Sequence, residues 1–234
     1  MTIPNYPTLL FATLFASGLA LAADPPNATR GDINHVNRSI HIGNGERAED
    51  LGTVNGSIVV GDDASIDTAE TVNGSVRLGR ASRANALETV NGSIAIGPDA
   101  VIAGSVETVN GSIKLDERAR VQDDAENVNG SLRLAREAHI GGRITTYNGD
   151  ISIGEAVQVE GGIVVKKSRG WNWFGTQRRP QITIAADAVV GDMIFEHEVE
   201  LRVHPSARIG RVEGATVQPL ESTSQPSADQ QPER

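Results

Sequence analysis

Residues 166–180, KKSRGWNWFGTQRRP, contain most of the side chains in this 234-residue chain that suit ligand binding. Both tryptophans lie here, and the segment has five Lys or Arg residues and no acid, although the whole chain carries a net charge of −9. Aromatic and basic side chains together suit an anionic membrane surface, a glycan or a groove on another protein. The segment predicts a binding loop formed by Lys166, Lys167, Arg169, Trp171, Trp173, Phe174, Arg178 and Arg179. The alternative is a hairpin that folds back and packs its rings on the flank of the protein.

The rest of the sequence lacks the spacing of a catalytic or metal site. The five histidines share no metal-ligand spacing, and the chain has no Cys, no H-E-x-x-H string and no phosphate-binding loop. Four glutamates recur at one position of a repeat: Glu70, Glu88, Glu107 and Glu126. Calcium needs several oxygens at one point, and the Gly-rich nonapeptide of calcium-binding solenoids is missing. We therefore predict a protein that is not an enzyme and that has no cofactor and no metal site.

The N-terminus has the pattern of an export signal. Residues 8–22, TLLFATLFASGLALA, are apolar and uncharged and end in an A-x-A string. This run is shorter than the roughly 20 apolar residues of a membrane span, so a signal peptide over residues 1–22 is the better interpretation. An uncleaved anchor or an apolar strand is the alternative, because residues 2–7 carry no Lys or Arg. We expect an exported protein in the periplasm, on the outer cell surface or secreted, and its acidity argues against nucleic acid as a partner.

A repeated string indicates how the chain positions these residues. V-N-G-S starts at Val54, Val72, Val90, Val109 and Val128, and diverged copies start at Val36 and Tyr147. Successive copies lie 18 or 19 residues apart, and a fixed period this short is typical of a repeat architecture. Alternating aliphatic residues such as Ile94 and Ile96 indicate strands. We therefore predict an all-β chain that forms a single parallel β-solenoid, or β-helix, of about nine coils of 18 or 19 residues.

The repeat also predicts the boundaries of the parts. We expect an N-terminal cap segment over residues 23–35 and the solenoid over residues 36–213, interrupted by the insertion at 166–180. Residues 214–234 are rich in Ser, Gln and Pro, which predicts a disordered tail. A charged tail opposes end-to-end stacking of uncovered strands. A monomer or small oligomer is therefore favoured, with self-association into a polymer-forming scaffold as the alternative.

Each Asn-Gly pair predicts a tight turn with Gly at a positive φ. Stacked in register, the asparagines would form a structural ladder of amide hydrogen bonds. Its members are Asn55, Asn73, Asn91, Asn110, Asn129 and Asn148. If Val54 points inward, Thr53 and its equivalents point outward, in an array similar to those of ice-binding solenoids. Ice binding is therefore an alternative function.

The motifs resemble two groups of bacterial solenoids. Strings such as ETVNGSI at residues 88–94 resemble the adhesin family of β-strand-repeat proteins. Turns such as IGPDAVI at residues 96–102 are similar to those of bactofilins, which form polymers, and of left-handed hexapeptide acyltransferases, whose catalytic histidine has no equivalent here. Bactofilins typically lack an export signal, so the adhesin-like group is favoured. The resemblance covers residues 36–213 and implies a solenoid, for which we expect right-handed winding.

From these observations we expect a non-enzymatic, adhesin-like binding or structural module of the bacterial cell envelope. Its partner would be an envelope protein, a glycan or an anionic membrane surface. A polysaccharide-active enzyme is a further alternative, but it would need a cluster of acids on one face that the repeat does not supply.

Overall fold

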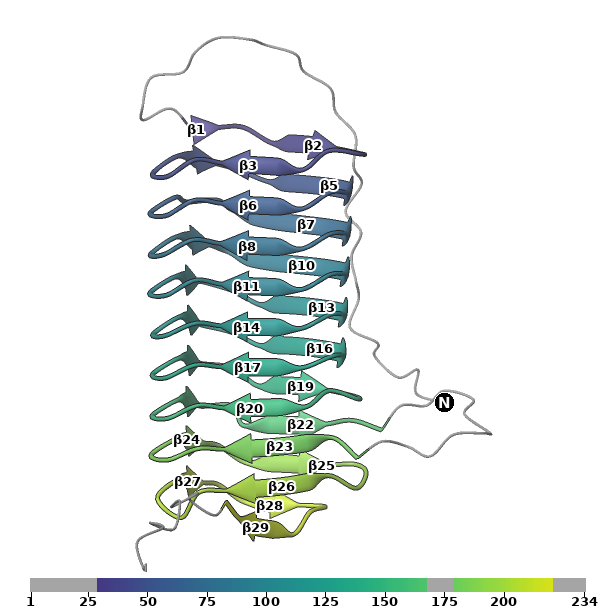
Figure 1. Cartoon of the computed structure of the whole chain (residues 1–234), viewed down its shortest axis with the longest axis vertical. Helices are drawn as coiled ribbons and strands as arrows, with labels where there is room; N and C mark the ends of the chain where they lie inside the picture. Colours follow the sequence, from purple (N-terminus) through teal and green to yellow (C-terminus); the bar gives the residue numbers. More distant parts are fainter. Residues whose placement is uncertain (1–28, 168–178, 221–234) are drawn as a thin grey trace, which may run out of the picture.

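The computed structural model describes residues 29–167 and 179–220, and every regular element within them is a β-strand. The strands pair in parallel and stack as a β-solenoid of about nine turns of about 19 residues, which confirms the predicted fold class. We call one turn a coil. The coils descend from β1 at the top of Figure 1 to β29 at the bottom. Among the described residues there is no helix long and apolar enough to cross a membrane.

A complete coil contributes one strand to each of three sheets, numbered here in the order in which the chain visits them from β2 onward. The first sheet contains β2 (Ile33–His35), β5 (Leu51–Asn55), β7 (Thr68–Asn73), β10 (Ala86–Asn91), β13 (Val106–Asn110), β16 (Ala125–Asn129), β19 (Ile144–Thr146), β22 (Ile163–Val165), β25 (Met193–Phe195) and β28 (Val212–Glu213). The second contains β3 (Ile40–Ile42), β6 (Ile58–Val60), β8 (Val76–Leu78), β11 (Ile94–Ile96), β14 (Ile113–Leu115), β17 (Leu132–Leu134), β20 (Ile151–Ile153), β23 (Gln181–Ile184), β26 (Glu200–Val203) and β29 (Val217–Pro219). The third contains β1 (Thr29–Arg30), β4 (Arg47–Ala48), β9 (Arg83–Ala84), β12 (Val101–Ile102), β15 (Arg120–Val121), β18 (His139–Ile140), β21 (Gln158–Val159), β24 (Val189–Val190) and β27 (Arg208–Ile209), with Ser65 as a single bridging residue between β4 and β9.

The core is a column of aliphatic side chains that all the coils share. In one coil, Leu87, Ile94, Ile96 and Ile102 are fully buried. The next coil repeats the arrangement, because Ile94 pairs directly with Ile113. A single coil could not bury these side chains, whereas stacked coils cover one another. Each buried aliphatic side chain contributes about 1.5–3 kcal/mol, which explains why the stack holds without disulfides.

The solenoid extends beyond the predicted limits of 36 and 213 at both ends. β1 and β2 lie in the segment assigned to a cap, and they pair with β4 and β5 as a first coil. β29 lies in the segment assigned to a disordered tail, and it pairs with β26. The end coils lack the V-N-G-S string, so the string alone underestimates the length of the stack.

The expected orientation of the Thr and Val positions is wrong. Thr53, Thr71 and Thr89 are buried inside the first sheet, whereas Val54 and Val72 are only partly buried on its outer surface. The physical reason is the alternation of side chains along a strand, in which residues two positions apart point to the same face. Each threonine lies two residues after an inward aliphatic residue, so it also points inward. The exposed threonine array that would support ice binding therefore does not exist on this face.

The glycines of the Asn-Gly turns are required for close packing of successive coils, not for a positive φ. Among the glycines of this string, only Gly130 has a φ in that range, at 137°. A Cβ added at Gly74 would lie 1.8 Å from the carbonyl oxygen of Gly56, and one at Gly92 would lie 1.8 Å from that of Gly74. The turns stack backbone on backbone, which leaves no room for a side chain.

Positive φ occurs instead at the turn between the second and third sheets. Non-glycine residues adopt it there, with φ between 51° and 60°, at Asp63, Ala81, Asp99, Arg118, Glu137, Ala156 and Asp187. A left-handed residue with a Cβ costs roughly 1–2 kcal/mol. The stack imposes this conformation coil after coil.

The insertion lies between β22 and β23. In the preceding coil the four residues 147–150 connect β19 to β20, and this is the turn that the insertion replaces. Lys166 and Lys167 follow β22, while Arg179 precedes β23. The five remaining members of the predicted binding loop lie at residues 168–178, outside the described residues: Arg169, Trp171, Trp173, Phe174 and Arg178.

Candidate functional site

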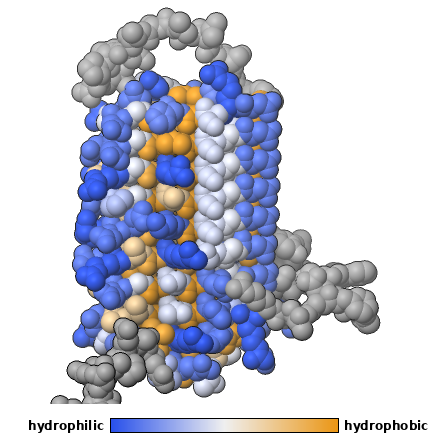
Figure 2. All heavy atoms as spheres, viewed as in Figure 1, coloured by the Kyte–Doolittle hydropathy of each residue, from blue (hydrophilic) through white to orange (hydrophobic). Residues whose placement is uncertain are grey.

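The Asn-Gly turns form one edge of the rod, and their side chains are linked along it. Each asparagine donates from Nδ2 to Oδ1 of the asparagine in the preceding coil, at 2.8–3.0 Å, from Asn55 onto Asn37 up to Asn148 onto Asn129. The intermediate donors are Asn73, Asn91, Asn110 and Asn129. Figure 2 shows this ladder as a continuous blue column at one side of the molecule. In the next coil the register pairs Thr146 with Val165, so Lys167 takes the position that Asn148 has in the ladder. The amide ladder therefore ends where the insertion begins.

A second ladder supports the same turns from inside. The Oγ1 hydroxyl of Thr89 donates to the carbonyl oxygen of Gly74 at 2.9 Å, and Thr71 and Thr108 make the equivalent bonds to Gly56 and Gly92. In one coil the Nδ2 of an asparagine at this position, Asn127, replaces the hydroxyl. A buried carbonyl without a partner is costly, so the threonines complete the turn. Their role is structural.

The first sheet carries the four glutamates as a column on its outer surface. Strand register pairs Glu70 with Glu88, Glu88 with Glu107, and Glu107 with Glu126. Each side chain is half-buried, and like charges at neighbouring strands repel. Burial, with repulsion from Glu70 and Glu107 added, raises the pKa of Glu88 to about 7. Burial also raises the pKa of the other three, and the Lys166 ammonium partly offsets the rise at Glu126.

The last glutamate of the column lies next to the base of the insertion. Glu126 Oε1 is shielded from solvent and has no hydrogen-bond partner among the described residues. The Lys166 ammonium lies 5.7 Å from the ring centroid of Tyr147, within the range of a cation–π contact. The acidic column of the first sheet therefore runs up to the basic insertion.

The three described residues of the predicted loop make contacts within the chain. Besides the contact of Lys166 with Tyr147, the backbone N–H of Lys167 donates to Glu196 Oε2 at 3.0 Å. Arg179 pairs with Glu198 at 2.7 Å, and both of these side chains are largely exposed. These contacts attach both ends of the insertion to the coils on either side.

The contacts of His204 and His139 were not predicted from the sequence. His204 Nδ1 lies 3.0 Å from Ser206 Oγ, the distance of a nucleophile and its base. The same nitrogen accepts the backbone N–H of Ser206 at 3.2 Å, so the pair is a local turn contact between residues two apart. His139 Nε2 lies 2.9 Å from Glu160 Oε1 on the outer surface. Within residues 29–167 and 179–220 no cluster of three or more His, Asp or Glu side chains could hold a metal ion.

The rod thus carries three features: the asparagine ladder along its turns, the acidic column on the first sheet, and one insertion whose two ends contact the coils. We find no family model, no curated protein and no solved structure that matches this chain.

Proposed function

We propose that the protein is an exported, non-enzymatic module of the bacterial cell envelope. It acts as a rigid β-solenoid that presents the insertion at 166–180 to an envelope component. The supporting observation is the position of this insertion, which replaces one turn of an otherwise continuous ladder of turns. Loops that a rigid scaffold holds frequently carry binding.

The chemistry of the insertion supports a polyanionic or glycan partner. Its five basic residues contrast with the charge of −9 on the whole chain, and it contains both tryptophans. Two lysines precede the tryptophans and two arginines follow them. Such a distribution suits an anionic membrane surface, a charged glycan or an acidic groove on an envelope protein.

The rigidity of the coils supports a role in presentation. Both ends of the insertion belong to one coil, because β22 pairs with β19 and β23 pairs with β20, the two strands that flank the equivalent turn of the preceding coil. A backbone hydrogen bond at Lys167 and an ion pair at Arg179 hold these ends. A segment with fixed ends loses less conformational entropy on binding than a free one.

The test is binding by the mature chain with Trp171→Ala and Trp173→Ala combined. The probes are vesicles of anionic lipid, vesicles of zwitterionic lipid and insoluble cell-wall polysaccharide, each analysed by co-sedimentation. We expect binding to one probe to fall at least about tenfold while the melting temperature stays unchanged.

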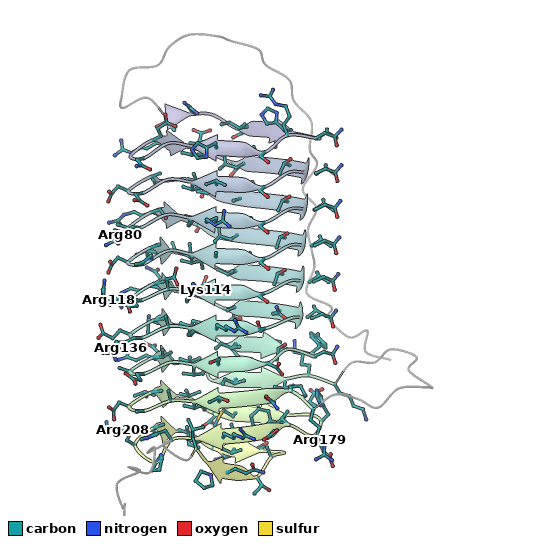
Figure 3. All side chains as sticks on the ribbon, in the orientation of Figure 1. Arg80, Lys114, Arg118, Arg136, Arg179 and Arg208 are labelled. Atoms are coloured by element: carbon teal, nitrogen blue, oxygen red, sulfur yellow. The ribbon has the colours of Figure 1, made fainter. Side chains whose placement is uncertain are left out.

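A matched control replaces two basic residues far from the insertion. Figure 3 shows Arg80 and Arg208 at one turn edge of the rod and Arg179, a member of the insertion, at the other side. The variant Arg80→Gln with Arg208→Gln should bind as the wild type does. A lower melting temperature of the tryptophan variant with unchanged binding would identify the insertion as a structural flap and contradict the proposal.

A further inference from the structure

The second sheet carries a basic column that faces outward at the same height as the acidic column of the first sheet. Strand register pairs Arg77 with Ala95, Ala95 with Lys114, and Lys114 with Arg133. The three basic side chains are exposed. Figure 3 shows Lys114 over the second sheet, away from the turn edge that carries Arg118.

The acidic and basic columns span the same four coils. At the position of the glutamates, the coil before Glu70 has Gly52 and the coil after Glu126 has Thr145, so the acidic column ends at both. At the position of the basic residues, the same two outer coils have Val59, before Arg77, and Ser152, after Arg133. Both columns therefore begin and end together and rise with the same strand spacing of about 4.8 Å.

Most of these charges have no partner of opposite sign within residues 29–167 and 179–220. Arg77 and Arg133 make no ion pair or side-chain hydrogen bond among the described residues, while Lys114 pairs with Asp116. On the acidic face, Lys166 is the only cation in the described part of the chain that lowers the pKa of a column member, and it acts on Glu126. Each column thus carries charge of one sign, and most of this charge is not compensated by the described residues.

We propose that two copies of this chain associate side by side, with the acidic column of the first sheet of one copy against the basic column of the second sheet of the other. In a parallel arrangement without stagger, Arg77, Lys114 and Arg133 of one copy face Glu70, Glu107 and Glu126 of its neighbour. This inference does not depend on the proposed function of the insertion.

The one coil of these four without a basic residue, which contains Glu88 and Ala95, fits the same arrangement. There Ala95 is the residue that faces Glu88, so this glutamate meets no cation. Glu88 is also the member of the column whose pKa is raised to about 7, so it is partly protonated at neutral pH. The glutamate that needs a counter-charge least is the one that receives none.

The residues beside the two columns allow close approach. Half-buried valines flank the glutamates, and a row of serines from the V-N-G-S strings precedes the basic column. Figure 2 shows this row as a pale column between the blue asparagines and the charged face. A face of about 40 Å by 10–17 Å, from the strand spacing and lengths, is at the low end of specific interfaces. We therefore expect weak association that salt reverses.

The two contacting surfaces differ, so each copy has one of each to offer. Such a heterologous contact forms a ring if its rotation closes and an open array if it does not. Sedimentation of the mature chain at about 50 mM and about 500 mM NaCl tests this. We expect the mass to rise with protein concentration beyond that of a dimer at low salt and to return to the monomer at high salt.

Two charge-reversal variants make the test specific. The first combines Glu70→Lys, Glu107→Lys and Glu126→Lys, and the second combines Arg77→Glu, Lys114→Glu and Arg133→Glu. Each variant alone should remain monomeric, because both of its faces carry the same sign. An equal mixture should associate, because every contact then joins a basic face to an acidic one.

A matched control reverses three charges elsewhere on the rod, with Arg80→Glu, Arg120→Glu and Arg208→Glu. It should associate as the wild type does, and circular dichroism should show that all variants keep the strand signal. A monomeric wild type at low salt, a variant that self-associates alone, or a mixture that stays monomeric would each overturn the proposal.

Discussion

Replacing Glu88 by Gln should raise the free energy of unfolding of the monomer at neutral and alkaline pH. In the folded protein the carboxyl is half-buried between Glu70 and Glu107, and its pKa is raised from 4.5 to about 7. A raised pKa means that the folded state binds the proton more tightly than the unfolded state does. The ionised form therefore costs stability, and this cost is absent below pH 4.5, grows up to about pH 7 and is then constant.

The magnitude follows from the two pKa values. The difference between 4.5 and about 7 corresponds to roughly 3.4 kcal/mol. Because the side chain is only half-buried, solvent screening reduces this to about 1–2 kcal/mol. For a protein of this size, 1 kcal/mol shifts the melting temperature by about 2–4 °C. Glu88→Gln should therefore melt about 2–8 °C above the wild type at pH 8 and close to it at pH 4.

Thermal unfolding by circular dichroism at pH 4 and pH 8 measures this difference. It is done at about 500 mM NaCl so that association between copies does not contribute. Glu49→Gln is the control, because Glu49 is exposed and lies outside the column. Equal melting temperatures of wild type and Glu88→Gln at pH 8, or the same gain for Glu49→Gln, would refute the reasoning.

Three further substitutions test the turns by thermal unfolding. Gly92→Ala should lower the melting temperature by at least about 6 °C, because its Cβ would lie 1.8 Å from a backbone oxygen, whereas Gly31→Ala should be neutral since no atom lies within 4 Å. Thr89→Val should cost about 1–3 kcal/mol because it leaves the carbonyl of Gly74 without its hydroxyl partner, and Thr89→Ser should retain most of the stability. Ala81→Gly should raise the melting temperature by a few degrees, because glycine adopts its φ of 51° without strain. A neutral Gly92→Ala, a Thr89→Val as stable as Thr89→Ser, or a destabilising Ala81→Gly would each contradict the packing described.

The sequence was sufficient to predict the coil because one signal repeats. Alternating aliphatics such as Ile94 and Ile96 indicate a strand, and their return every 18 or 19 residues indicates a stack. The repeat also located the insertion, since its register fails after Val165. The end coils were missed because they keep the aliphatic positions of the repeat but not its turn.

The orientation of the first sheet needed a different signal. Thr89 and Val90 are both β-branched, so β-propensity does not decide which points inward. The pattern Leu87, Thr89 was informative, because an aliphatic residue precedes the threonine by two positions in most coils. The contact between Gly92 and Gly74 could not be predicted, because it depends on how closely two coils approach.

The charge pairing of the two faces also required the structure. Glu107 and Lys114 are seven residues apart in the sequence, and only the strand register shows that each belongs to a column of like charge. The sequence did show the recurrence of the glutamates. It did not show that they are half-buried, which is the main cause of their raised pKa values.

The stacking of successive coils determines the position of both charged columns and of the insertion, and distances between spin labels test this stacking most directly. The chain has no cysteine, so single pairs can be introduced without background, with His41→Cys combined in turn with Lys114→Cys, Arg133→Cys and Arg202→Cys on the exposed face of the second sheet. These pairs lie four, five and eight coils apart in the strand register. The account predicts backbone separations of about 19, 24 and 38 Å, in proportion to the number of coils. Distances that do not increase in that proportion would contradict the solenoid.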